Sequence, residues 1–130
     1  MKLFLAAFFA CALASLGACS QETSAPTAID NRMTEESTIL IIRFNVAEDR
    51  LDDFLGVMTN INGLMAGEDG FINAVVYRNN DDPLAFTLVE SWETRGHHEK
   101  HFQHIDASGD WADIVAMLKT YPAMSYNQTL

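Results

Sequence analysis

Cysteine is almost absent from the 130-residue chain, and the two that occur lie near its amino terminus. Cys11 falls inside the first apolar run, and Cys19 comes soon after that run ends. The sequence beyond residue 19 therefore offers no disulfide, no thiolate metal ligand and no cysteine nucleophile. Any chemistry in the rest of the chain depends on other side chains.

Basic residues are also scarce, since 8 Lys and Arg stand against 18 Asp and Glu, for a formal net charge of −10. Proteins that bind nucleic acid neutralise phosphates with clusters of basic side chains. The composition therefore argues against nucleic acid as a partner. Long apolar runs are limited too: the run from Leu3 to Leu16 is shorter than the about 20 residues that span a bilayer.

Residues 1–18 have the organisation of an export signal: a lysine, an apolar run and then small residues. The sequence Leu-Gly-Ala-Cys that ends at Cys19 resembles the lipobox of bacterial lipoprotein precursors. The resemblance implies cleavage after residue 18 and a lipid on Cys19, which anchors the mature protein in the cell envelope. Ser20 is not the aspartate of many inner-membrane lipoproteins, so in a cell with two membranes we expect the outer membrane, facing the periplasm. A plain secretory signal followed by a chance cysteine is the alternative.

Residues 19–37 are polar and lack periodicity, so we interpret them as a flexible tether and residues 38–130 as one domain. Within the domain, β-branched apolar runs predict strands, and apolar residues three and four apart predict helices. The predicted strands are 38–46, 70–79, 84–93 and 124–130, and the predicted helices are 47–66, 94–104 and 110–118. The turn residues at 80–83 join the second and third strands in a hairpin.

This order of elements predicts an α+β, ferredoxin-like β-α-β-β-α-β fold with a four-stranded antiparallel sheet and helices on one face. The third strand places apolar side chains on both of its sides: Phe86, Leu88 and Trp92 on one, Ala85 and Val89 on the other. The face that the helices leave open therefore needs a cover. We expect a second copy of the chain to supply it in a homodimer.

Short motifs follow one another through the domain in a fixed order. They are Gly70-Phe71, the segment Val76–Asn79, Asp82-Pro83, Phe86, Val89-Glu90-x-Trp92 and His101. In order and spacing they resemble the antibiotic biosynthesis monooxygenase (ABM) family, whose members are dimeric α+β barrels, and the resemblance covers residues 38–130. It implies oxidation of a small aromatic substrate, such as a quinol, by O₂ without a cofactor.

An oxygenase without a cofactor must take a proton from an electron-rich phenol and hold the intermediate away from water. His101 is the candidate catalytic base, because histidine titrates near neutral pH. Trp92 is the candidate stacking wall for a flat ring, and Glu90, on the same strand face, would orient the base or accept a substrate hydrogen bond. The structural alternatives are a core aromatic for Trp92, a hydrogen bond to the sheet for His101, and a cap or ion pair for Glu90.

Further candidates for substrate binding are Phe86, Leu88 and Tyr77, of which Tyr77 has a surface position as its alternative. All four histidines, His97, His98, His101 and His104, lie within one predicted helix. His97, His101 and His104 share a face, but the first and last are about 10 Å apart along the axis, too far for one ion. We therefore expect a solvated helix face and no metal site.

The sequence leaves two functions open. One is a cofactor-independent monooxygenase acting on a quinol or related phenol, and the other is a lipid-anchored dimer that binds a small apolar or aromatic ligand without turnover. Haem binding or degradation is disfavoured, because haem-degrading relatives carry an asparagine early on the first strand, where this chain has only Asn45 at the end. Leu88 likewise stands where some polyketide monooxygenases have an asparagine.

Overall fold

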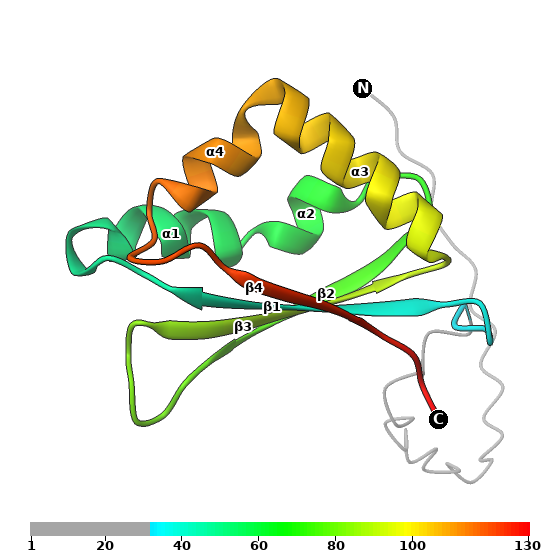
Figure 1. Cartoon of the computed structure of the whole chain (residues 1–130), viewed down its shortest axis with the longest axis horizontal. Coiled ribbons are helices and arrows are strands. Elements are labelled where there is room, and N and C mark those ends of the chain that lie inside the picture. Colours follow the sequence, from blue (N-terminus) through cyan, green and yellow to red (C-terminus); the bar gives the residue numbers. More distant parts are fainter. Residues whose placement is uncertain (1–31) are drawn as a thin grey trace, which may run out of the picture.

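The computed structural model describes residues 32–130, which form a four-stranded antiparallel sheet covered by helices (Figure 1). The strands are β1 (Thr38–Asn45), β2 (Phe71–Arg78), β3 (Ala85–Trp92) and β4 (Ala123–Asn127), in the sheet order β2-β3-β1-β4. The helices are η1 (Glu48–Arg50), α1 (Leu51–Met58), α2 (Ile61–Met65), α3 (Arg95–Ser108) and α4 (Asp110–Val115). These helices all lie on one side of the sheet (Figure 1). The predicted ferredoxin-like α+β fold is confirmed.

The amino-terminal predictions fall largely outside this description. The export signal at 1–18, the lipidation site Cys19 and the tether up to residue 31 lie outside the described residues. The end of the predicted tether contacts the domain, because Arg32 donates hydrogen bonds to the carbonyls of Phe71 and Ile72 at 3.1 and 2.9 Å. The folded part therefore begins before residue 38. Within residues 32–130, no helix is both long and apolar enough to cross a membrane.

The helix predicted at 47–66 is three short segments instead of one. Between α1 and α2, Thr59 Oγ1 donates to the Leu55 carbonyl at 2.7 Å, and Asn60 Nδ2 donates to the Gly56 carbonyl at 2.9 Å. Side chains that bond to the backbone in this way compete with the helix's own hydrogen bonds. The apolar periodicity continues through the break, so the sequence pattern did not reveal it.

The second half of the chain also departs from the predicted boundaries. α3 continues through the predicted loop to Ser108, and Gly109 alone separates it from α4. Gly109 has a φ of 93°, which glycine adopts at little cost, so one residue is enough to turn the chain. α4 ends at Val115, and Leu118, predicted to be helical, pairs with Val46 in an isolated β-bridge. The last strand is 123–127 and not 124–130.

The core lies between the sheet and the helices. Residues of β3 alternate between buried and half-buried, and the buried ones, on the face toward the helices, are Phe86, Leu88, Glu90 and Trp92. Phe54 of α1 packs against Phe44 and Phe86, with ring centroids 5.2 and 5.0 Å apart. These ring contacts fix the helical layer on the strands.

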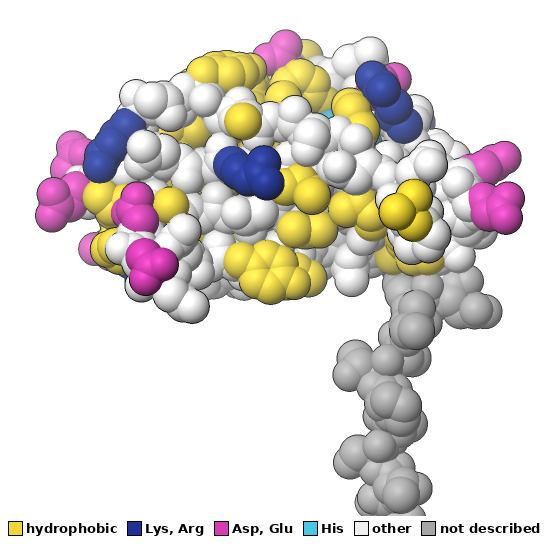
Figure 2. All heavy atoms as spheres, turned by 60° about the horizontal axis from the view of Figure 1, so that its bottom comes forward, with side chains coloured by type: hydrophobic (Ala, Val, Ile, Leu, Met, Phe, Trp, Pro, Cys, Tyr) yellow, Lys and Arg dark blue, Asp and Glu magenta, His cyan; other side chains and the backbone are white. Residues whose placement is uncertain are grey.

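The opposite face of the sheet is apolar as well. Ile41, Val75 and Val89 lie side by side on it in adjacent strands, and Val75 and Tyr77 are 41% and 57% exposed. Seen partly from this side, hydrophobic side chains spread across the surface, with Lys and Arg side chains among them (Figure 2). This is the surface on which the sequence predicts a homodimer, and the dimer itself stays a prediction.

The two edges of the sheet differ. At β2, the Asn62 side chain of α2 bonds to Ala74: Nδ2 donates to the carbonyl at 2.6 Å, and Oδ1 accepts from the amide at 2.8 Å. An adjacent strand would make the same two bonds, so Asn62 occupies the place of a neighbour there. The other edge strand is β4.

Candidate active site

A cavity of about 480 Å³ lies between the sheet and the helices, a size typical of small-molecule sites. Most of its wall is apolar and includes Met58, Met65, Leu88, Phe102, Ile105, Trp111 and Met117. Ionisable side chains also reach it: Glu68, Glu90, His98, His101, His104, Asp110 and Asp113. The cavity therefore suits a largely apolar ligand that has a polar group at one place.

Glu90 is the most perturbed ionisable group at this wall. It points from β3 toward the helices and is 4% exposed, and its Oε2 accepts a hydrogen bond from Trp92 Nε1 at 2.9 Å. Burial raises the pKa of Glu90 to about 7, against a smaller lowering effect of the Trp92 hydrogen bond. Near neutral pH this carboxyl therefore exists both with and without its proton, as a general acid or base requires.

His98 is buried beside Glu90 and is 4% exposed. Its Nδ1 lies 2.7 Å from the Tyr126 hydroxyl, and its Nε2 lies 3.8 Å from Glu90 Oε2. Burial, and then the neighbouring His101, lower the pKa of His98 to about 4. The ring is therefore neutral at pH 7, and its contact with Glu90 is not an ion pair but a contact between polar groups.

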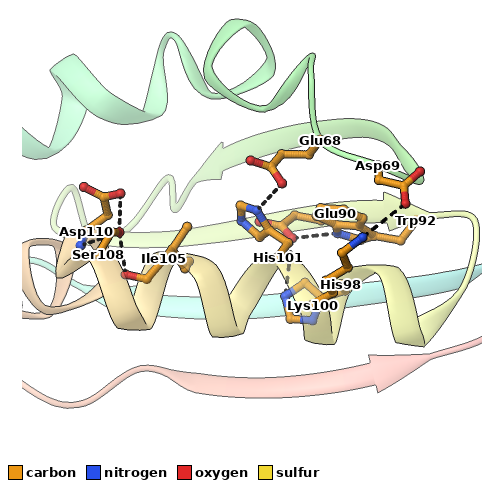
Figure 3. A network of polar contacts seen from close by, with 10 residues as sticks. All are labelled: Glu68, Asp69, Glu90, Trp92, His98, Lys100, His101, Ile105, Ser108 and Asp110. Atoms are coloured by element: carbon orange, nitrogen blue, oxygen red, sulfur yellow. Dashed lines mark hydrogen bonds and ion pairs between the residues drawn. The ribbon is translucent and has the colours of Figure 1, made fainter.

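His101, the predicted base, also lines the cavity. Its ring lies over Trp92, with centroids 5.1 Å apart and planes tilted by 34°. Its Nδ1 is 3.3 Å from Glu68 Oε2 without forming a hydrogen bond, and this buried nitrogen has no hydrogen-bond partner among residues 32–130. Figure 3 shows Glu68 and Glu90 near His101, from two different parts of the chain.

The other predicted site residues lie in three different places. Leu88 lines the cavity, whereas Phe86 packs in the core and borders a separate hollow beside β2. Trp92 is fully buried against Phe71 and the histidine rings and is not part of the cavity wall. It contacts the two cavity residues instead, through its hydrogen bond to Glu90 and its ring contact with His101. Tyr77 lies on the opposite face of the sheet, because strand side chains alternate, and this corrects its placement in the pocket.

The histidine row of α3 does not form one face of the site. His97 Nδ1 lies 2.9 Å from Thr94 Oγ1, outside the cavity, whereas His104 lines it. Across residues 32–130, no three His, Cys, Asp or Glu side chains are grouped so that they could hold a metal ion. Sequence reasoning overlooked His98, although His98, Phe102 and Ile105 follow the i, i+4, i+7 spacing of an inward helix face.

The fold and cavity define a ferredoxin-like domain with a ligand-sized space between its sheet and its helices. Residues 37–113 match the family model described as antibiotic biosynthesis monooxygenase, and the chain belongs to this family. No curated protein matches the chain.

Solved structures share the fold at low sequence identity. A mutant of SnoaB, a cofactor-independent oxygenase from Streptomyces nogalater, is 13% identical with a TM-score of 0.63, over 72% of this chain and 93% of that chain. A conserved protein from Methanosarcina mazei Go1 is 14% identical with a TM-score of 0.66, over 74% of this chain and 95% of that chain. A candidate antibiotic biosynthesis monooxygenase from Bordetella bronchiseptica is 22% identical with a TM-score of 0.62, over 73% of this chain and 98% of that chain.

Proposed function

We propose that this protein is a cofactor-independent monooxygenase whose substrate is a quinol or a related phenol. The proposal rests on the position and pKa of Glu90: its carboxyl lies at the wall of a mostly apolar cavity, and burial raises its pKa to about 7. Membership of the ABM family and the shared fold with the oxygenase SnoaB support it.

The chemistry needs a base, an enclosed space and O₂. The Glu90 carboxylate takes a proton from the substrate, and the resulting anion adds to O₂ to form a peroxide anion. The protonated Glu90 returns the proton, and the hydroperoxide loses water to leave a carbonyl group. In total the substrate loses two hydrogen atoms and gains one oxygen atom, and the second oxygen atom leaves in water. The largely apolar wall limits the contact of the intermediate with water.

His101 has a second role in this proposal. Its buried Nδ1 has no hydrogen-bond partner within the described chain, and a buried polar atom in that state is stabilised when a ligand bonds to it. We assign His101 to the substrate oxygen and the proton transfer to Glu90. The sequence alone favoured the reverse assignment, with His101 as base and Glu90 orienting it.

Oxygen uptake by the purified, metal-stripped full-length protein in detergent tests the proposal, with a panel of quinols and anthrones. We expect uptake above the rate without enzyme for at least one compound, and a loss of about 10²–10⁴-fold in Glu90→Gln. Tyr77→Phe, on the opposite face of the sheet, is the control and should match the wild type. Uptake at the background rate for every compound, from folded protein, would contradict the proposal.

The second candidate function is ligand binding without turnover. The largely apolar wall of the cavity favours it, because apolar burial gives affinity without chemistry. Trp111 lines the cavity, so its fluorescence should report binding. Saturable quenching by a quinol, with no oxygen uptake, would support this function instead.

A further inference from the structure

A line of polar side chains leads from the cavity to the surface of the molecule. It begins at Glu90 on the cavity wall and passes His98, whose Nε2 lies 3.8 Å from Glu90 Oε2. It ends at the Tyr126 hydroxyl on β4, 2.7 Å from His98 Nδ1. Tyr126 is half-buried and lines an open surface hollow together with Thr38, Arg95 and Asn127.

Glu90 has little direct contact with solvent. It is 4% exposed, and its hydrogen-bond donor, Trp92, has an indole N–H that gives a hydrogen bond but cannot accept a proton. Glu90 must nevertheless lose its own proton before it can act as a base, since with a pKa of about 7 it is protonated in part of the molecules near neutral pH. The catalytic cycle then needs no net proton transfer, because Glu90 returns to the peroxide the proton that it takes from the substrate.

His98 has the properties that a proton carrier at this position needs. A neutral imidazole has one N–H and one bare nitrogen, so it can accept a proton on one side while it gives one up on the other. Burial and the neighbouring His101 keep the pKa of His98 at about 4, so the neutral form dominates at pH 7. Its two nitrogens point to the two groups that would be linked, Glu90 and Tyr126 (Figure 3 shows the Glu90 side).

We propose that His98 and Tyr126 form a relay that carries protons between Glu90 and the solvent. The inference rests on the proposed function, in which Glu90 is the base. The Glu90 O–H gives its proton to His98 Nε2, the His98 Nδ1–H passes to the Tyr126 oxygen, and the Tyr126 O–H passes to water. Three N–H or O–H bonds form and three break, no electrons are transferred, and one proton leaves.

The route works in both directions. When Glu90 takes up a proton from solvent, the reverse transfers through Tyr126 and His98 return His98 to its first tautomer. The 3.8 Å gap between His98 Nε2 and Glu90 Oε2 must close by about 1 Å, or be bridged by one water, for the transfer to occur.

Arg95 lies where it assists the outer end of the relay. Its guanidinium carbon is 4.2 Å from the centroid of the Tyr126 ring, and its Nε donates to Glu99 Oε1 at 2.7 Å. A cation over the ring stabilises electron density on the phenolic oxygen as the proton leaves it. Arg95 acts here against burial and the Glu99 charge, which together raise the pKa of Tyr126. The Glu99 carboxylate holds the guanidinium in place.

The relay can be tested without turnover, because Trp92 donates to Glu90 and its fluorescence should report the charge on that carboxyl. Full-length protein carrying Trp111→Phe, which removes the other tryptophan, is subjected to a rapid pH jump across pH 7. We expect Tyr126→Phe and His98→Gln to slow the relaxation by about tenfold or more. Tyr77→Phe should leave the rate unchanged, and Glu90→Gln should abolish the signal.

Turnover separates the relay from the function on which it rests. In an active enzyme moved rapidly from pH 5 to pH 8, Tyr126→Phe should delay the onset of oxygen uptake, because Glu90 loses its proton more slowly. A high concentration of a small buffer such as imidazole should shorten that delay. Equal relaxation rates in the Tyr126→Phe variant and its Tyr126 parent would overturn the relay, whatever the oxygen uptake. A slowed relaxation in a protein without oxygen uptake would support the relay and refute the monooxygenase.

Discussion

Two buried residues, Glu90 and His98, have pKa values shifted in opposite directions. The Glu90 pKa is raised from 4.5 to about 7, and the His98 pKa is lowered from 6.5 to about 4. Between pH 4.5 and 6.5 the folded state holds a protonated Glu90 and a neutral His98, and the unfolded state holds the reverse. Both states then bind the same number of protons at this pair, so the pair gives the free energy of unfolding no pH dependence across that range.

Single substitutions should reveal the two opposing effects. In Glu90→Gln only His98 remains, and the unfolded state binds the extra proton, so stability relative to wild type should rise with pH from about 4 to 6.5. In His98→Gln stability should fall as pH rises from 4.5 to about 7, because the folded state holds the extra proton. Each slope should approach about 1.4 kcal/mol per pH unit in urea unfolding. Parallel profiles in all three proteins would be evidence against the shifts.

Trp92→Phe separates two roles of that ring. The substitution removes the Nε1 hydrogen bond that lowers the Glu90 pKa, so the pKa should move further above 7. The acidic limb of the kcat/KM profile, on which activity rises as Glu90 loses its proton, should move to higher pH with it. If Trp92 stacked on the substrate instead, KM would rise and the limb would stay in place.

At the scale of elements, the turn into β2 depends on a glycine. Gly70 has a φ of 73°, and a Cβ at this position would clash with the His97 side chain of α3. Gly70→Ala should therefore destabilise the protein by about 2 kcal/mol or more, from backbone strain and the clash together. Thermal unfolding measures this, and adding His97→Ala should recover the part that the clash contributes.

The control for that prediction is Gly63→Ala in α2. A Cβ there meets nothing within 4 Å, and alanine favours a helix by about 1 kcal/mol. This variant should be as stable as the wild type or more so. Equal losses at residues 63 and 70 would contradict the role assigned to the Gly70 turn.

The sequence located all four strands, because β-branched apolar runs and turn residues mark them locally. It predicted one helix where Thr59 and Asn60 interrupt it, since their side-chain bonds to the backbone leave no trace in the apolar pattern. The site was predicted in part: Glu90 and His101 do line the cavity. Tyr126 was missed because it reaches His98 only after β4 returns beside β1, a contact that local spacing cannot show.

At the scale of the whole molecule, we predict a homodimer through the helix-free face of the sheet. A second copy would cover Val75 and Tyr77, which are exposed. Light scattering at micromolar concentration should give twice the mass of one chain, and Val75→Glu should shift the protein toward the monomer. Leu130→Glu, at the fully exposed carboxyl terminus, should not. A monomeric wild type would exclude this interface.

We also predict that the mature protein begins at a lipidated Cys19. The apolar run that ends in the lipobox-like sequence motivates this expectation. Intact mass of the membrane-extracted protein should show acyl additions on an amino-terminal Cys19, and Cys19→Ser should lack them. An unmodified, soluble mature chain would contradict the prediction. In a cell with two membranes, fractionation should recover the protein with the outer one.

The Asn62 side chain at the β2 edge limits how the protein can polymerise. A fibril grows by strand addition only if each molecule offers two open sheet edges, one to accept a neighbour and one to pass the contact on. Asn62 already occupies the amide and carbonyl of Ala74, and Arg32 bonds to the Ile72 carbonyl, so the first half of β2 is a poor template for another strand. Within residues 32–130, edge-to-edge pairing is then favoured at β4, and two copies joined through β4 would have only their partly covered β2 edges left for further growth.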